Sequence, residues 1–195
     1  MLRLGFLASN NGTAMRAVIQ DIALGRLDAQ AVLVVSNKDS ARATSFARDA
    51  GVPTCVIPTV HDPAGADLLL CEALLASGTN LVTLSGYLRK LGPMTLRAFE
   101  NRILNTHPAL LPAFGGIGMY GRKVHEAVLA SGMQETGATI HLVDGDYDHG
   151  SIIAQERFPV PAGIDAQGLE SLVMEVERSL MLNTLGRIAS GAIPL

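Results

Sequence analysis

The sequence lacks the features that mark membrane-bound and extracellular proteins. Although 48% of its 195 residues are hydrophobic, no apolar run reaches the roughly 18 residues that a membrane-spanning helix needs. Its two cysteines, Cys55 and Cys71, form no C-x-x-C motif and lie in apolar segments, which indicates buried thiols rather than a disulfide or a metal site. The start, MLRLGFLAS, is too short for a signal peptide and leads directly into a predicted strand. We therefore expect a soluble, cytoplasmic protein.

Clustered positive charge is also missing. The formal net charge is -3, and no run is rich in lysine or arginine, which argues against binding to nucleic acid or to a membrane surface. The chain has no internal repeat, low-complexity tract or interdomain linker. With 195 residues it is long enough to bury a full core. We expect one domain over residues 1–195.

What is present is an alternation of strand patterns with helical patterns. Strand patterns occupy 2–8, 31–36, 52–57, 80–84 and 103–107, and helical patterns occupy 14–22, 41–50 (capped by residues 37–40), 66–76, 93–99, 124–130 and 166–188. This alternation predicts an α/β fold with an open, mainly parallel sheet and helices on both faces. Segments 136–143 and 151–158 alternate in polarity, so we expect them to pair as an antiparallel excursion in the C-terminal part.

The segment RILNTHPALLP, residues 102–112, carries the main candidates for catalysis. Asn105 and His107 are two residues apart at the end of a predicted strand, so both side chains point to one face, and Pro108 prevents the strand from continuing. An amide and an imidazole at this edge of an open sheet, where ligands bind, can stabilise an oxyanion and move a proton. On these residues alone, a structural turn with a capping asparagine is the favoured interpretation.

A second polar cluster, Asp-Gly-Asp-Tyr-Asp-His-Gly at residues 144–150, changes that balance. Its alternating acids are similar to a calcium loop, but His149 and Gln155 stand where that template requires Gly and Glu. We therefore favour a turn with one functional carboxylate over a metal site. Solvated hairpin acids are the alternative interpretation.

Two glycine-containing segments remain open to two interpretations each. Ser9 to Thr13 joins a strand to a helix and suits a phosphate group through exposed N–H groups, but an ordinary capped turn fits equally well. Residues 113–123, AFGGIGMYGRK, fit either a lid beside the catalytic strand or a plain linker. The chain has no G-x-S-x-G motif, so a serine hydrolase has little support.

Taken together, these motifs resemble the phosphoribosylglycinamide formyltransferases. The resemblance rests on SNNGTAM, VVSNKDS, LSGYLRKLGP, ILNTHPALLP and TGATIHLVDGDYDHGSIIAQ in this order, followed by a closing helix with Glu177. Its most specific part is Asn-x-His-Pro followed by His-x-Val-x(4)-Asp-x-Gly. It implies transfer of the formyl group of 10-formyltetrahydrofolate to the amine of glycinamide ribonucleotide in purine biosynthesis, without a metal.

The resemblance also implies a role for each matching residue. Asn105 and His107 would be catalytic with Asp148 as their acidic partner. Acceptor binding would involve the phosphate turn and a residue near the ribose or glycinamide end, namely Gly12, Thr13, Ala14 and Glu177. The folate would contact Leu88, Arg89, Leu91 and the segment that includes His141 and Asp144. Whether the protein forms a homodimer is left open.

The remaining histidines have weaker claims to a role. For His141 we favour packing under the site over orienting Asp148. His61 and His125 are expected at the surface or behind the site. Two functional alternatives stay open: another enzyme of the superfamily, acting on a different small phosphorylated amine or hydrolysing formyltetrahydrofolate, and a silent nucleotide- or folate-binding regulator.

Overall fold

A seven-stranded sheet organises the chain in the computed structural model, which describes residues 1–195. Its strand order is β3-β2-β1-β4-β5-β6-β7. The first five strands run parallel, whereas β6 and β7 are antiparallel to their neighbours. The expected mainly parallel sheet with an antiparallel excursion is confirmed.

The elements alternate as the sequence predicts. The strands are β1 (Leu2–Leu7), β2 (Ala29–Ser36), β3 (Thr54–Val56), β4 (Leu81–Leu84), β5 (Ile103–His107), β6 (Glu135–Leu142) and β7 (Ile152–Pro159). The helices are α1 (Thr13–Ala23), α2 (Arg42–Asp49), α3 (Pro63–Ala76), α4 (Pro93–Ala98), α5 (Arg122–Ala130) and α6 (Ala166–Ala189). No helix is both long and apolar enough to cross a membrane.

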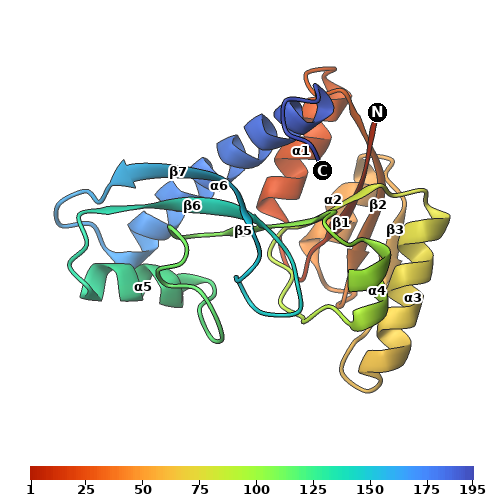
Figure 1. Ribbon diagram of the computed structural model, residues 1–195, viewed down its shortest axis with the longest axis horizontal. Helices are drawn as coiled ribbons and strands as arrows, with labels where there is room; N and C mark the ends of the chain where they lie inside the picture. Colours follow the sequence, from red (N-terminus) through yellow and green to blue (C-terminus); the bar gives the residue numbers. More distant parts are fainter.

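The sheet separates two hydrophobic cores. Strand β1 shows why, because successive side chains of a strand point to opposite faces: Phe6 joins one core and Leu7 the other. The larger core lies under α1, α2, α5 and α6, and the smaller lies under α3 and the segment around α4. In Figure 1, α3 and α4 lie at one end of the molecule, and α5 lies with β6 and β7 at the other.

The starts of α2 and α3 differ from the prediction for reasons that the structure shows. Residues 37–40 do not cap α2, whose N-cap is Ala41 without a side-chain hydrogen bond. The side chain of Asn37 instead accepts a hydrogen bond of 2.6 Å from the hydroxyl of Ser9, which ties the end of β2 to the turn after β1. Helix α3 begins at Pro63, three residues earlier than expected, because Asp62 caps it and proline suits the first helical position.

Candidate active site

The site lies at the point where the strand order reverses. Chain connections run from β1 outward through β2 to β3, then return to β4 on the other side of β1. In open α/β sheets, ligands bind beyond the carboxyl ends of the strands at such a switch point. Hydrogen bonds join the segments after β1 and β4 here, from Ser9 N–H to the Gly86 carbonyl at 3.1 Å and from Ser85 N–H to the Leu7 carbonyl at 2.9 Å.

Asn105 and His107 lie at the carboxyl end of β5. Strand β6 lies beside them with Asn105 opposite His141 and His107 opposite Thr139. Directly opposite residues of antiparallel strands project from the same face. The amide Nδ2 of Asn105 accordingly lies 3.1 Å from Nε2 of His141.

The structure brings Asp148 to the same point. Its carboxylate lies 3.3 Å from Nδ1 of His107 and 3.4 Å from Nε2 of His141. It also accepts a hydrogen bond of 3.0 Å from the N–H of Gly116. Asp148 adopts a left-handed backbone conformation with a φ of 56°, which aspartate tolerates better than most residues. Residues from β5, β6 and the loop after β5 thus converge on the carboxylate of Asp148 in the turn before β7.

These contacts keep Asp148 ionised. Burial by itself raises the pKa of a carboxyl group. For Asp148 the hydrogen bonds from His107 and His141, the charge of His107 and the hydrogen bond from Gly116 outweigh burial and hold the pKa well below its usual range. The site therefore holds a carboxylate whose charge is compensated by its neighbours.

His141 is more than a packing residue. Its Nδ1 lies 2.8 Å from the carbonyl oxygen of Leu142, and a carbonyl only accepts, so this nitrogen carries a hydrogen. Nε2 lies between the amide of Asn105 at 3.1 Å and the carboxylate of Asp148 at 3.4 Å, so the ring contacts both groups. Of the two roles considered for His141, the geometry agrees with the orienting one, with Asn105 as the contact that sequence reasoning missed.

The turn after β1 presents free N–H groups at the start of α1. Gly12 is the N-cap in a left-handed conformation and, having no side chain, makes no capping hydrogen bond of its own. A Cβ atom at Gly12 would lie 3.1 Å from Cβ of Ala43 and from Cε of Met15. The N–H of Met15 is already bonded to the hydroxyl of Ser85 at 3.1 Å. The N–H groups of Thr13 and Ala14 are left for an anion at the positive end of the helix.

Glu177 lies on α6, the helix that packs against α1 and α5. The residue is half-buried. Burial, together with the charge of Glu170, raises the pKa of Glu177 to about 8. Such a group is largely protonated at neutral pH and can both donate and accept a hydrogen bond.

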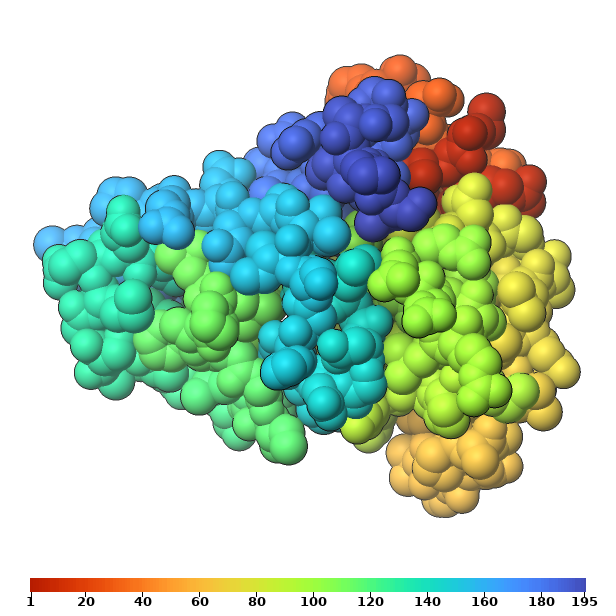
Figure 2. Space-filling view, in the orientation of Figure 1, coloured from red at the N-terminus to blue at the C-terminus, as the bar shows by residue number.

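A narrow cleft of about 70 Å³ begins at Asn105 and His141. Figure 2 shows its two walls side by side on one face of the molecule, the segment after β4 and the segment between β6 and β7. Nζ of Lys90 on the first wall lies 5.9 Å from the ring centre of Tyr147 on the second. Four of the five residues expected at the folate line this cleft, namely Arg89, Leu91, His141 and Asp144. Leu88 does not line it, and its N–H is bonded to the Ser9 hydroxyl at 2.8 Å.

The other polar groups are less suited to catalysis or to metal binding. No group of three His, Cys, Asp or Glu side chains is arranged to hold a metal ion. In the acidic turn, Asp144 accepts a hydrogen bond of 2.9 Å from the N–H of Asp146. His61 is exposed, whereas His125 is 2% exposed, so of the two positions considered for His125 the structure shows the buried one. Burial lowers the pKa of His125, which favours the neutral ring.

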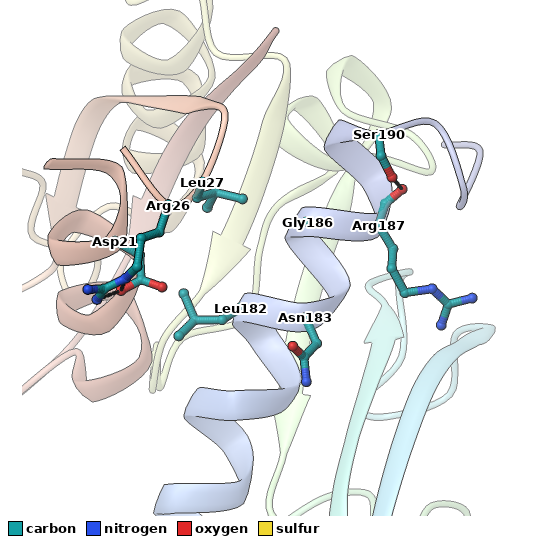
Figure 3. Close-up of a pocket in the computed structure, with 8 residues that line it drawn as sticks. All are labelled: Asp21, Arg26, Leu27, Leu182, Asn183, Gly186, Arg187 and Ser190. Carbon is teal, nitrogen blue, oxygen red and sulfur yellow. Dashed lines mark hydrogen bonds and ion pairs between the residues drawn. The ribbon is translucent and has the colours of Figure 1, made fainter. Parts of the chain in front are cut away.

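A larger hollow of about 310 Å³ lies elsewhere, between the end of α1 and the last turns of α6. Figure 3 shows that its charged groups do not converge: Arg26 pairs with Asp21, and Arg187 points away from both. No catalytic constellation is present there.

Sequence reasoning missed the residues that support the site from behind. The hydroxyl of Thr139 donates to the carbonyl of Ala109 at 2.7 Å and accepts from the N–H of Leu111 at 3.0 Å. Gln155 donates to the Thr139 hydroxyl and to the Leu111 carbonyl, each at 2.9 Å. Both residues occupy alternating positions in predicted strands, but nothing in their spacing identifies the loop after β5 as their partner.

The fold and the arrangement of amide, imidazoles and carboxylate together point to one class of protein. The family described as formyl transferase matches residues 2–185, and the chain belongs to it.

Individual relatives make the similarity more specific. The chain is 37% identical over 194 residues to a protein named "Phosphoribosylglycinamide formyltransferase, chloroplastic" of Arabidopsis thaliana, and the match covers 98% of this chain and 66% of that protein. It is 37% identical to "Phosphoribosylglycinamide formyltransferase" of Mycobacterium tuberculosis, covering 98% and 86%. The crystal structure of glycinamide ribonucleotide transformylase 1 from Symbiobacterium toebii superposes with a TM-score of 0.91 at 32% identity, covering 100% and 91% of the two chains.

Proposed function

We propose that this protein transfers the formyl group of 10-formyltetrahydrofolate to the amine of glycinamide ribonucleotide, a step of purine biosynthesis. The observation that carries the proposal is the convergence of Asn105, His107 and Asp148 at the switch point of the sheet, within hydrogen-bonding or ion-pairing reach of one another through His141. Support comes from relatives that bear the name of this activity over nearly the whole chain.

The acceptor is proposed to bind between α1 and α6. Its phosphate group accepts hydrogen bonds from the N–H groups of Thr13 and Ala14, where Gly12 allows close approach. Glu177 on the neighbouring helix contacts the ribose or the glycinamide end. A protonated carboxyl at neutral pH suits a hydroxyl partner, because it can donate and accept at once.

The formyl donor is proposed to occupy the cleft that begins at Asn105. Arg89 and Leu91 on one side and residues between His141 and Asp146 on the other line this cleft. The contact between Lys90 and Tyr147 bridges these walls, so a folate ring enters only when the two side chains separate. The donor supplies the formyl group as a substrate, and no metal takes part in the proposal.

Asn105 and His107 are proposed to stabilise the negative charge that develops on the formyl oxygen when the amine attacks. The amide nitrogen of Asn105 carries two hydrogens and has one contact, with Nε2 of His141, so at least one hydrogen is available for this oxygen. Nε2 of His107 is bonded to the Phe114 carbonyl at 2.7 Å, so the proposed donor is Nδ1–H, which lies 3.3 Å from the carboxylate of Asp148 at the edge of the cleft. A preorganised donor of this kind contributes about 3 kcal/mol to transition-state stabilisation.

The proton of the attacking amine must reach the departing nitrogen of the folate. With its lowered pKa, Asp148 is a weak base while His107 is charged, and it then acts by stabilising the imidazolium. When His107 gives its Nδ1 proton to the departing nitrogen, the carboxylate loses its charge partner and becomes more basic, since the two groups titrate as a coupled pair. The pair then takes up the proton of the amine, and the resting state is restored.

The test is a panel of amines with 10-formyltetrahydrofolate, read as release of tetrahydrofolate. The proposal expects release that depends on glycinamide ribonucleotide and yields one formylated acceptor per tetrahydrofolate. Release without any amine would instead identify a hydrolase. A larger kcat/KM for another phosphorylated amine would identify a different acceptor, and binding of both substrates without turnover would identify a silent binding protein.

A further inference from the structure

The glycine-rich segment after β5 contacts both members of the His107–Asp148 pair. The carbonyl oxygen of Phe114 accepts a hydrogen bond of 2.7 Å from Nε2 of His107. Two residues later, the N–H of Gly116 donates to the carboxylate of Asp148 at 3.0 Å. Three consecutive residues thus supply one acceptor to the imidazole and one donor to the carboxylate.

The backbone of this segment is specialised for these contacts. Phe114 and Gly116 adopt positive φ angles of 56° and 94°, and a left-handed conformation is unusual for an aromatic residue. Strained residues of this kind persist only where the surroundings hold them. A Cβ atom at Gly115 would lie 2.6 Å from Cδ2 of Leu111 and 3.3 Å from Cβ of Asp148. Glycine at position 115 therefore permits the close approach.

The two hydrogen bonds decide where His107 carries its protons. A carbonyl oxygen cannot donate, so Nε2 of His107 must carry a hydrogen to bond Phe114. Nδ1 faces an ionised carboxylate at 3.3 Å, and a lone pair on that nitrogen would be repelled. Both ring nitrogens consequently carry a hydrogen, which makes the ring an imidazolium.

We propose that residues 114–116 form a positioning clamp that holds His107 doubly protonated against an ionised Asp148, with Nδ1–H directed at that carboxylate. This extends the proposed formyl transfer and rests on it. In this arrangement Gly115 and Gly116 allow the loop to approach Asp148 closely.

The loop offers a matched pair of variants. Gly116→Ala and Gly118→Ala introduce the same side chain at similar φ angles of +94° and +87°, and at both positions a new Cβ atom meets nothing within 4 Å. Strain at position 116 displaces the N–H that holds Asp148, whereas Gly118 makes no contact with the pair. We expect Gly116→Ala to lower kcat by about 10-fold or more, because small misplacements of catalytic groups have effects of this size. Gly118→Ala should stay within about twofold of the wild type.

Two further readouts separate positioning from general damage to the loop. The acid limb of the kcat profile should move to higher pH in Gly116→Ala, because the hydrogen bond from Gly116 helps to keep the pKa of Asp148 low. The ring nitrogens of His107, assigned in ¹⁵N spectra by difference from His107→Asn, should both show the imidazolium signature in the wild type and in Gly118→Ala. That signature should weaken in Gly116→Ala. Gly115→Ala, which pushes the segment away from Asp148, should behave as Gly116→Ala does.

The outcomes are distinguishable from failure of the proposed function. The spectra need no turnover, so they test the clamp even if no amine is formylated. A neutral His107 ring in the wild type at neutral pH would overturn the proposal. Equal losses of kcat in Gly116→Ala and Gly118→Ala, with unchanged ring signals in both, would also overturn it, because only the general integrity of the loop would then matter.

Discussion

The carboxyl group of Glu177 provides a test that links stability to the acceptor site. Burial and the charge of Glu170 raise its pKa from 4.5 to about 8. The folded protein therefore keeps a proton that the unfolded chain releases at lower pH. The stability contributed by this group is complete below the unfolded value and is lost as the pH rises through the folded value. Glutamine cannot ionise, so the Glu177→Gln variant should not lose this stability as the pH rises.

The magnitude follows from the difference between the two pKa values. A difference between 4.5 and about 8 corresponds to at most about 5 kcal/mol, at about 1.4 kcal/mol for each pH unit. Because the side chain keeps some exposure to water, we expect about half of this. Glu177→Gln should raise the free energy of unfolding by about 2 kcal/mol at pH 8 and leave it nearly unchanged near pH 4.5.

The assay is urea unfolding followed by circular dichroism between pH 4.5 and 8.5. Glu175→Gln is the control, because Glu175 lies on the same helix with its side chain 68% exposed and paired with Arg178. This control should change the unfolding free energy by less than about 0.5 kcal/mol at any pH. If wild type and Glu177→Gln differ by the same amount at both ends of the range, Glu177 is not protonated in the folded state and the reasoning fails.

Three further predictions concern the catalytic groups and the phosphate turn. Asn105→Ala should lower kcat about 100-fold through loss of one oxyanion donor, with little change in KM; wild-type release of tetrahydrofolate would remove Asn105 from the mechanism. Gly12→Ala places a methyl group 3.1 Å from Ala43 Cβ at a φ of +61° and should raise KM for the phosphorylated acceptor but not for its dephosphorylated form, and equal KM values would contradict the phosphate turn. The lowered pKa of Asp148 adds stability above its unfolded pKa that is lost on acidification, so Asp148→Asn should flatten the fall in unfolding free energy below about pH 4; parallel profiles in acid titrations of urea unfolding would show otherwise.

Much of the fold could be read from local patterns. Alternation of strand and helix patterns predicts a parallel sheet because parallel neighbours need a crossover between them. The antiparallel pair followed from period-two polarity in residues 136–143 and 151–158 and was found at 135–142 and 152–159. The cap of α2 was predicted wrongly because Asn37 takes part in a hydrogen bond with Ser9, 28 residues away. Such distant partners leave no trace in a local pattern.

The candidate site divides in the same way. The spacing of Asn105 and His107 places both side chains on one face, because strand periodicity is a local property. The contact of Asn105 with His141 depends on the register between β5 and β6. A shift of one residue would turn His141 to the opposite face, and the sequence does not contain that register. For this reason the sequence alone could not decide between the two roles considered for His141.

By itself, the sequence determined which groups could do the chemistry and at which edge of a sheet they would emerge, since side-chain alternation and proline breaks act within a few residues. Only the tertiary structure decided which groups meet. Asp148 reaches His107 from a turn 41 positions along the chain, and the backbone of Phe114 and Gly116 fixes both. These contacts are set by packing of whole strands and loops against each other, and packing of this kind depends on all the elements at once.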